Sequence, residues 1–379
     1  MAERLRIALI TERFGRRFGG AESYAVSLFE ILSARHDVTV IAREFDHALP
    51  IREVRVNGMR GWPGWIKALH FAWQAKSLSS GFDVVHTHAM GPAGDIHVVH
   101  VVPVRFRRLI DRSWWRAGLS CLQPRNIAYL WLEASSVRSL PGRVVVAVSP
   151  SVRQQLQRAY PSVTAVEMIP PGAQETPTDP AIRFNIRDQF GWSETDIGCL
   201  LVARNPLRKG FAAALLAFES LPDRYKLAVV GADAESRQHL ASRHPALAHR
   251  VSLVDPVSSV SPYYQAADIY VHPTLMDSFG MAPLEAMAHG LPVVLSAREF
   301  CGFAEFVRDR VDAWILQNPR DPIQITEALI ALGENNAMRQ QFVRESEALV
   351  HAHAWPVVAK RYESLYFRVL RERTKHTSA

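Results

Sequence analysis

The sequence alternates short apolar, β-branched runs with segments of helical periodicity, and it does so in both halves. In the first half the apolar runs lie at 6–11, 37–42, 83–88 and 144–149. In the second half they lie at 198–204, 225–231, 269–273 and 291–296. Strands that alternate with helices are typical of a parallel sheet covered by helices on both faces. We therefore predict two α/β domains, each doubly wound.

A proline-rich stretch separates the two halves. Residues 167–181, EMIPPGAQETPTDPA, hold four prolines and one glycine, a composition typical of a hinge or boundary. Two such domains would leave a cleft between them, with binding loops beyond the carboxyl ends of the strands. We predict domains over 1–169 and 170–352. Residues 353–379 should form an amphipathic helix that returns to the N-terminal domain.

Composition and cysteine usage narrow the class of protein. The chain has 379 residues, of which 48% are hydrophobic, which is ordinary for a globular protein of this length. Cys121, Cys199 and Cys301 are isolated, so neither a disulfide framework nor a zinc site is indicated. The N-terminal apolar run is too short for a signal peptide. No apolar stretch approaches the roughly 20 residues that span a bilayer. We expect a cytoplasmic protein.

The net charge of +7 is unevenly placed. Residues 1–170 hold 22 Lys and Arg against 13 Asp and Glu, a balance of +9. Residues 171–379 hold 22 against 24, a balance of −2. The surplus suggests that the first half meets an anionic partner, and the alternative is a solvated basic face. No helix-turn-helix, zinc module or aromatic RNA-binding motif supports nucleic acid as that partner.

One segment concentrates the basic residues. Residues 104–120, VRFRRLIDRSWWRAGLS, interleave arginines with aromatic and aliphatic side chains. Such a segment suits the interface of an anionic membrane, and the alternative is a core helix with solvated arginines. The predicted contacts with the inner membrane surface are Arg105, Arg107, Arg108, Arg112, Trp114 and Trp115.

The stretch at 272–294, HPTLMDSFGMAPLEAMAHGLPVV, places a carboxylate on each side of a turn that opens a helix. Pro283 suits the first helical turn, and Gly290 suits the position after the last. The amides of Phe279, Gly280, Met281 and Ala282 would then attract a phosphate. Asp277 and Glu285 could accept hydrogen bonds from hydroxyl groups, or they could serve only as helix caps. A nucleotide diphosphate sugar has phosphates for this cradle of amides and hydroxyl groups for the two carboxylates.

Two further loops follow predicted strands. VARNPLRKGF, at 202–211, carries Arg204, Arg208 and Lys209, which could neutralise a diphosphate, or the loop could be a basic surface turn. RFGRRFGGAESYA, at 13–25, carries Gly19 and Gly20, which allow a ligand to approach the backbone closely.

Together these motifs resemble the retaining glycosyltransferases of family 4, which have the two-domain GT-B fold. D277-x7-E285 resembles the family's E-x7-E motif, with Asp in first place. Arg204 and Lys209 match its R-x4-K pair, and Gly19, Gly20 and Glu22 match its GG(x)E loop. Pro170-Pro171-Gly172 stands where the family usually has P-N-G. Within the family, the details look most like lipopolysaccharide core glucosyltransferases of Gram-negative bacteria.

The resemblance implies roles for individual residues. Glu285 would contact the donor ribose and Asp277 the transferred sugar, while Arg204 and Lys209 would stabilise the departing diphosphate. Gly19, Gly20 and 279–282 would complete its cradle. The family also uses an N-terminal-domain histidine. His100, after an apolar run, is our first choice and His97 the second. The predicted acceptor contacts are Glu22, His88, Asp95 and His97.

The implied reaction is transfer of a sugar with retention at the anomeric carbon and without a metal or cofactor. The expected donor is a UDP-sugar. The expected acceptor is a glycolipid or oligosaccharide in the synthesis of lipopolysaccharide or another envelope glycan, on the inner face of the cytoplasmic membrane. The alternatives are an epimerase-like GT-B enzyme and an inactive homologue that binds a nucleotide sugar.

Overall fold

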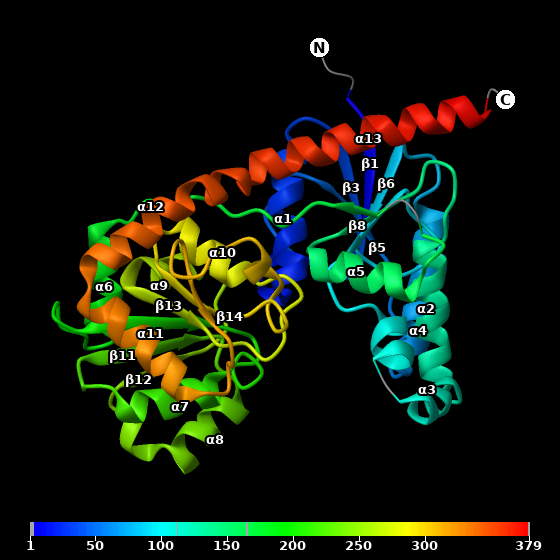
Figure 1. The fold of residues 1–379 in the computed structure, drawn as a ribbon. Coiled ribbons are helices and arrows are strands. Elements are labelled where there is room, and N and C mark those ends of the chain that lie inside the picture. Colours follow the sequence, from blue (N-terminus) through cyan, green and yellow to red (C-terminus); the bar gives the residue numbers. More distant parts are fainter. Residues whose placement is uncertain (1–3, 112, 164–165, 378–379) are drawn as a thin grey trace. The chain divides into compact units, whose positions relative to one another are not determined.

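A computed structural model describes residues 4–111, 113–163 and 166–377 (Figure 1). The chain forms two compact units. Unit 1 comprises Met1–Pro171 and Trp355–Ala379, and unit 2 comprises Gly172–Ala354. Each unit is an α/β layer structure built on one parallel sheet. The prediction of two Rossmann-like, doubly wound domains is confirmed.

The sheet of unit 1 has seven parallel strands in the order β5-β3-β1-β6-β7-β8-β9. In chain order they are β1 (Arg6–Ile10), β3 (Asp37–Ala42), β5 (Arg52–Arg55), β6 (Val84–Thr87), β7 (Ile96–Val99), β8 (Val144–Ala147) and β9 (Val166–Met168). A small second sheet pairs β2 (Arg13–Gly15) with β4 (Glu44–Asp46). The central strands β1, β6 and β8 are mostly buried, because helices cover both faces of a parallel sheet.

The helices of unit 1 include the last helix of the chain. They are η1 (Arg16–Phe18), α1 (Gly20–Ser33), α2 (Gly64–Leu78), the π-helical turn η2 (Phe106–Ile110), α3 (Trp114–Cys121), α4 (Pro124–Val137), α5 (Pro150–Ala159) and α13 (Trp355–Thr377). Helix α13 packs on α1, and the buried hydroxyls of Tyr24 and Tyr362 lie 2.7 Å apart between them. The apolar stripe of α13 therefore belongs to the core of unit 1.

The sheet of unit 2 has six parallel strands in the order β12-β11-β10-β13-β14-β15. They are β10 (Ile197–Val202), β11 (Tyr225–Val230), β12 (Val251–Val254), β13 (Ile269–His272), β14 (Val293–Ser296) and β15 (Trp314–Leu316). The direction of chain winding reverses between β10 and β13, which lie side by side. In sheets of this kind ligands bind at such a switch point, beyond the carboxyl ends of the strands.

The helices of unit 2 cover this sheet. They are α6 (Pro180–Gln189), α7 (Phe211–Ser220), α8 (Ala234–Arg243), η3 (Pro245–Leu247), α9 (Ser261–Ala266), α10 (Met281–Ala288), η4 (Gly302–Glu305), α11 (Pro322–Glu334) and α12 (Asn336–Ala352). Phe211 and Phe218 of α7 and Leu329 of α11 are fully buried in the main core cluster against the strands. This core fixes the strand ends from which the candidate site is built.

Candidate functional site

Two loops meet at the switch point of unit 2. Residues 203–210 follow β10, and residues 273–280 follow β13. The Leu275 amide donates to the Arg208 carbonyl at 3.1 Å, and the Gly210 backbone passes directly over Pro273. Gly210 has φ +84°, and a Cβ there would lie 1.9 Å from the Pro273 oxygen. Glycine is therefore required where these two loops touch.

The contact brings Lys209 and Asp277 together. Lys209 Nζ lies 2.5 Å from Asp277 Oδ2, and His272 Nε2 lies 3.2 Å from the same oxygen. Burial of the Asp277 carboxyl opposes its ionisation. The hydrogen bond from His272 and the charge of Lys209 outweigh burial, so the pKa of Asp277 lies well below its usual value. Asp277 is thus an ionised carboxylate, and its Oδ1 carries no recorded hydrogen bond from the described residues.

The backbone around Asp277 is held on both sides. Its amide donates to the Phe300 carbonyl at 2.6 Å, and its carbonyl accepts from the Gly302 amide at 3.1 Å. The His272 side chain is buried, and burial lowers the pKa of its imidazole. The Tyr270 hydroxyl lies 3.3 Å from His272 Nδ1. The carboxylate is therefore pre-organised rather than carried on a free loop.

The predicted phosphate cradle is the start of α10. Gly280 has φ +99°, and a Cβ there would lie 2.8 Å from Cys301 Sγ. The Phe279 side chain is buried against Phe303 and Phe306. Met281 and Ala282 are the first two helical residues, whose amides have no partner within the helix. These two amides are therefore the ones that a phosphate could meet at this turn.

Glu285 lies in the second turn of α10. Tyr264 Oη lies 3.1 Å from Glu285 Oε2 and 3.2 Å from the Ala282 carbonyl. Tyr264 is fully buried, and burial raises the pKa of its hydroxyl well above the ordinary value. The phenol therefore stays protonated and donates. It orients the carboxylate of Glu285 from the core side of the helix.

The other predicted cations of the loop are exposed. Arg204 and Arg208 lie on the surface. Neither side chain has a recorded hydrogen bond or ion pair with the described residues, so both are available to a ligand. The structure therefore joins Lys209 directly to Asp277 and leaves the two arginines unpaired at the same strand end.

In unit 1 the glycine loop also lies at a switch point. Gly19 caps α1, and the loop 11–19 follows β1, whose neighbour β6 is reached only later in the chain. The Ser23 amide donates to the Gly19 carbonyl at 2.8 Å, which begins the helix. The carboxylate of Glu22 is paired with Arg13 at 3.0 Å. Gly19 and Gly20 thus open a helix at the ligand-binding edge of this sheet.

Three histidines form a chain at the same edge. His86 Nε2 lies 3.0 Å from His88 Nε2, and the rings of His88 and His100 have centroids 4.6 Å apart. Burial lowers the pKa of His86 to about 3 and that of His100 to about 4. Both are therefore neutral near pH 7. The buried Nε2 of His100 has no hydrogen-bond partner among the described residues.

Asp95 and His97 are placed differently from His88 and His100. Asp95 precedes β7, at the amino edge of the sheet, and its carboxylate accepts from the Val85 amide at 2.7 Å and from Arg373. His97 is buried within β7, with Nε2 3.2 Å from the Gly94 carbonyl. Sequence spacing could not show which of these residues lie at the amino edge of the sheet and which at the carboxyl edge. The geometry gives both residues structural contacts and offers no support for their predicted acceptor role.

Comparison with known proteins identifies the family. A family model described as "Glycosyl transferases group 1" matches residues 182–348, and one described as "Glycosyltransferase Family 4" matches residues 18–175. The chain belongs to glycosyltransferase family 4. The first match contains Arg204, Lys209, Asp277 and Glu285, and the second contains Gly19, Gly20 and the histidine chain.

Two relatives cover most of this glycosyltransferase. A phosphatidyl-myo-inositol mannosyltransferase of Mycobacterium tuberculosis is 28% identical over 371 residues, which is 92% of this chain and 93% of the relative. A D-inositol 3-phosphate glycosyltransferase of Xylanimonas cellulosilytica is 27% identical over 324 residues, 79% of this chain and 75% of the relative.

Solved structures confirm the GT-B fold. WaaG, described as a glycosyltransferase involved in lipopolysaccharide biosynthesis, superposes with a TM-score of 0.81 at 20% identity, over 94% of this chain and 98% of that one. HepE of Anabaena, solved with UDP and glucose, superposes with a TM-score of 0.74 at 15% identity, over 95% and 99% of the two chains.

Two residues of the glycosyltransferase site were missed from the sequence. His272 stands at the end of a predicted strand, five positions before Asp277, and that position beside the site was a usable signal. Tyr264 lies on the short helix α9, 21 positions before Glu285, and nothing in the spacing indicated their contact. Both residues act by orienting a carboxylate.

The basic segment of the enzyme is not one helix. It consists of the π-helical turn Phe106–Ile110 and then α3, and Arg112 lies outside the described residues. Glu133 anchors its start by accepting from the amides of Val104 and Arg105, the latter at 2.8 Å. Trp114 is 86% exposed and Trp115 49% exposed. The tryptophans are thus presented outward rather than packed in a core.

The described part of the enzyme has two features that concern membranes and metals. None of its helices there has both the length and the apolar character needed to cross a bilayer. Its described His, Cys, Asp and Glu side chains form no group of three or more that could hold a metal ion.

Proposed function

We propose that this glycosyltransferase moves a sugar from a nucleotide diphosphate sugar, with a UDP-sugar favoured, to a glycolipid or oligosaccharide acceptor, with retention at the anomeric carbon. The observation that carries the proposal is the Lys209–Asp277–His272 cluster beside the first amides of α10. Cations and free amides suit a diphosphate, and an ionised carboxylate suits sugar hydroxyls. One edge of the unit 2 sheet thus has groups for both the diphosphate and the sugar of the donor.

Lys209 and Arg204 would supply the positive charge that a bound metal supplies in other enzymes. As the bond between sugar and diphosphate breaks, negative charge grows on the leaving oxygen. Lys209 and the exposed Arg204 would stabilise this charge, and electrostatic stabilisation usually contributes more to such catalysis than any other single effect. The phosphate oxygen itself would take the proton of the incoming hydroxyl, so the new bond forms on the face from which the diphosphate leaves.

The pairing of Lys209 with Asp277 has a consequence for donor binding. In the unliganded enzyme the amine already has an anionic partner, so a diphosphate must share it. Asp277 keeps its charge because His272 also donates to it. Its free Oδ1 would then accept from a hydroxyl of the transferred sugar. Glu285, oriented by Tyr264, would accept from the donor ribose.

The donor and acceptor classes rest on the relatives. HepE was solved with UDP-glucose as well as with UDP and glucose, which supports a UDP-sugar donor. The mannosyltransferase relative acts on phosphatidyl-myo-inositol, and WaaG serves lipopolysaccharide biosynthesis, which supports a lipid-linked acceptor. We assign this enzyme to the synthesis of a cell-envelope glycan on the cytoplasmic side of the membrane. His100 stays our prediction for the histidine near the transferred sugar.

Calorimetry with nucleotides tests the donor site. UDP, GDP, ADP and CMP are titrated into the enzyme and into its Lys209→Ala and Glu285→Ala variants. We expect UDP to bind, and each variant to bind it about 10- to 100-fold more weakly, since a hydrogen bond to a charged group contributes about 1.5–3 kcal/mol. Arg243→Ala, at the exposed last residue of α8, is the matched control. Unchanged affinity in both site variants would refute the assignment.

We further propose that α3 and the preceding turn dock the enzyme on an anionic membrane. Trp114, Leu119 and Leu122 are exposed apolar side chains, and Arg105, Arg107 and Arg116 are exposed cations on the same segment. Exposed tryptophans beside arginines suit the headgroup region. Vesicles containing anionic lipid should bind the enzyme, and reversing the charges of Arg107, Arg108 and Arg112 should abolish this. Binding that survives the reversal contradicts the proposal.

A further inference from the structure

Unit 2 contains a cavity that none of the donor-loop residues lines. It has a volume of about 440 Å³ and is lined by residues 289–292 and by side chains of α6, α9 and α12. Asp268 and Pro292, which line it, directly precede β13 and β14, so the cavity lies at the amino edge of the sheet. Lys209 and Asp277 follow the carboxyl ends of β10 and β13. The two places are therefore on opposite edges of the same sheet.

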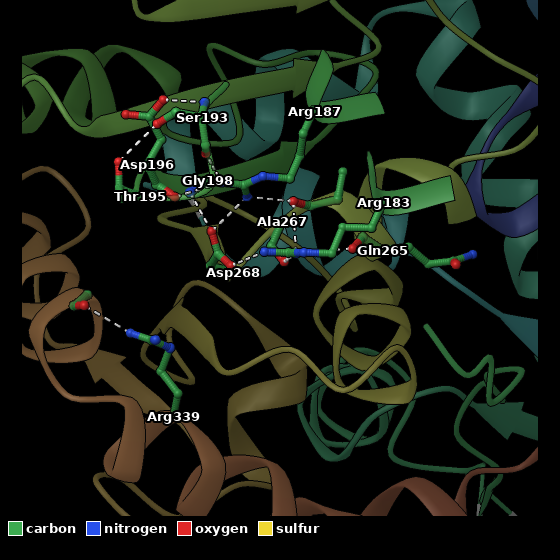
Figure 2. A network of polar contacts seen from close by, with 12 residues as sticks. Arg183, Arg187, Ser193, Thr195, Asp196, Gly198, Gln265, Ala267, Asp268 and Arg339 are labelled. Carbon is green, nitrogen blue, oxygen red and sulfur yellow. Dashed lines mark hydrogen bonds and ion pairs between the residues drawn. The ribbon is translucent and has the colours of Figure 1, made fainter. Parts of the chain in front are cut away.

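The lining of this cavity is strongly cationic. Three arginines line it, Arg183, Arg339 and Arg344, and Asp268 is the acid among its lining residues. Asp268 is already saturated, because it accepts from Arg183 at 2.6 Å and from Arg187 at 3.0 Å (Figure 2). It also accepts from the Gly198 amide at 2.7 Å. The charges of Arg339 and Arg344 are therefore not balanced by an acid of the cavity wall.

The two α12 arginines differ in what they contact. Arg339 donates to the carbonyls of Leu332 and Gly333 at 2.5 and 2.9 Å and to Asn336 Oδ1 at 3.1 Å, so its guanidinium is fixed at the end of α11. Arg344 is exposed and has no recorded hydrogen bond or ion pair with the described residues. The free guanidinium fork of Arg344 matches the oxygens of a phosphoryl group, and the fixed charge of Arg339 adds to the attraction.

The rest of the lining mixes uncharged polar side chains with apolar ones, among them Leu291, Pro292 and Val343. Asn336 and Gln340 of α12 and Gln265 of α9 contribute amides, and Thr178 contributes a hydroxyl. Such groups hydrogen bond to hydroxyls. The volume of the cavity falls within the roughly 300–1,000 Å³ of small-molecule pockets. It is larger than a lone phosphate needs. We propose that this cavity binds a phosphorylated small molecule of sugar-phosphate size, and that its occupancy is linked to Glu285 of the donor site.

The link runs through His289. This residue lines the cavity, its Nδ1 lies 2.7 Å from the Glu285 carbonyl, and its Nε2 lies 2.8 Å from Ser261 Oγ. Because a carbonyl only accepts, Nδ1 carries the proton and Nε2 accepts from Ser261. Tyr264 stacks on the His289 ring, with centroids 4.9 Å apart, and its hydroxyl contacts Glu285 Oε2. A ligand that shifts His289 therefore acts on both ends of Glu285.

Calorimetry with glucose 6-phosphate tests the binding site, with inorganic phosphate and glucose as partial ligands. We expect saturable binding of glucose 6-phosphate, weaker binding of phosphate and none of glucose. Arg344→Glu should weaken the binding of glucose 6-phosphate at least tenfold. Arg320→Glu makes the same charge change on an exposed loop and should have no effect. Binding that Arg344→Glu leaves unchanged, or that does not saturate, overturns the site.

The Lys209→Ala variant separates this cavity from the donor loops. If glucose 6-phosphate occupies the proposed cavity, Lys209→Ala should bind it with unchanged affinity. Loss of binding in Lys209→Ala would place the ligand at the donor loops and overturn the second site. Because Arg344 makes no contact that the fold needs, Arg344→Glu should keep the melting temperature of the wild-type enzyme.

The link to Glu285 rests on the proposed donor function and is measured separately. UDP affinity is determined with and without saturating glucose 6-phosphate, and we expect at least a threefold difference. Thermodynamic linkage requires that saturating UDP change the affinity for glucose 6-phosphate by the same factor. Equal UDP affinities overturn the link. If UDP does not bind at all, the donor assignment fails and the link falls with it, while the direct glucose 6-phosphate titration still decides the cavity.

Discussion

The hydroxyl of Tyr366, on the last helix of the chain, lies 2.6 Å from Nδ1 of His86, in the fourth strand of the unit 1 sheet counted from its β5 edge. The two residues are 280 positions apart. Both are fully buried, and the other ring nitrogen of His86, Nε2, contacts His88 Nε2. The C-terminal helix thus supplies one end of a polar chain that reaches the predicted ligand edge of the N-terminal unit.

Removing this hydroxyl should destabilise unit 1. Tyr366→Phe leaves the buried Nδ1 of His86 without a partner, which typically costs about 1–3 kcal/mol. Urea denaturation followed by tryptophan fluorescence measures the free energy of unfolding. Tyr129→Phe is the matched control, because the hydroxyl of Tyr129 has no recorded hydrogen bond among the described residues. Equal stability of the two variants would contradict the assigned contact.

The buried histidines predict a loss of stability in weak acid. The pKa of His100 is lowered from 6.5 to about 4, so between these values the unfolded chain binds a proton that the folded chain does not. Stability then falls as the pH falls through this window. For His100 alone the loss is on the order of 3 kcal/mol. His100→Gln should show a smaller drop between about pH 7 and pH 5 than the wild type, and parallel curves would refute the prediction.

His272 should control the ionisation of Asp277. The folded pKa of Asp277 is lowered, so its ionised form contributes stability above its ordinary pKa of 3.8, and this is lost as the pH falls through the folded value. His272→Ala removes the largest lowering influence, so the pKa of Asp277 should rise. Carboxyl ¹³C NMR measures it directly. His272→Gln keeps a donor at this position and should raise the pKa less; an identical pKa in both variants would speak against the hydrogen bond.

Tyr264 should act on donor affinity through Glu285. Tyr264→Phe keeps the ring that stacks on His289 and removes only the hydroxyl that contacts the carboxylate. We expect UDP to bind about three- to tenfold more weakly, corresponding to the roughly 0.5–1.5 kcal/mol of one hydrogen bond. Tyr263→Phe alters the neighbouring tyrosine, whose hydroxyl has no recorded hydrogen bond among the described residues, and should bind UDP normally. Weakening in both variants would point to helix α9 as a whole rather than to the carboxylate contact.

Much of the fold could be predicted because buried parallel strands leave a local signal. The run at 37–42 is a strand with those same bounds, and the run at 225–231 differs only at its last residue. Strand β5 was missed, because its sequence REVR belongs to an edge strand that is mostly exposed. The bounds of α10 also follow from local residues, since Gly280 and Gly290 both adopt positive φ at its two ends.

Local sequence was enough to predict which residues follow each strand. It therefore predicted the doubly wound fold, the glycine turns and the gathering of Lys209, Asp277 and Glu285 at one edge of the sheet. Their contact partners came from the three-dimensional packing. Lys209 meets Asp277 across 68 positions, and Asp95 turns away to Val85 and Arg373. The physical reason is that backbone propensity and apolar periodicity act over a few residues. The pairing of a buried charge depends instead on which chain segments close packing brings within about 3 Å of it.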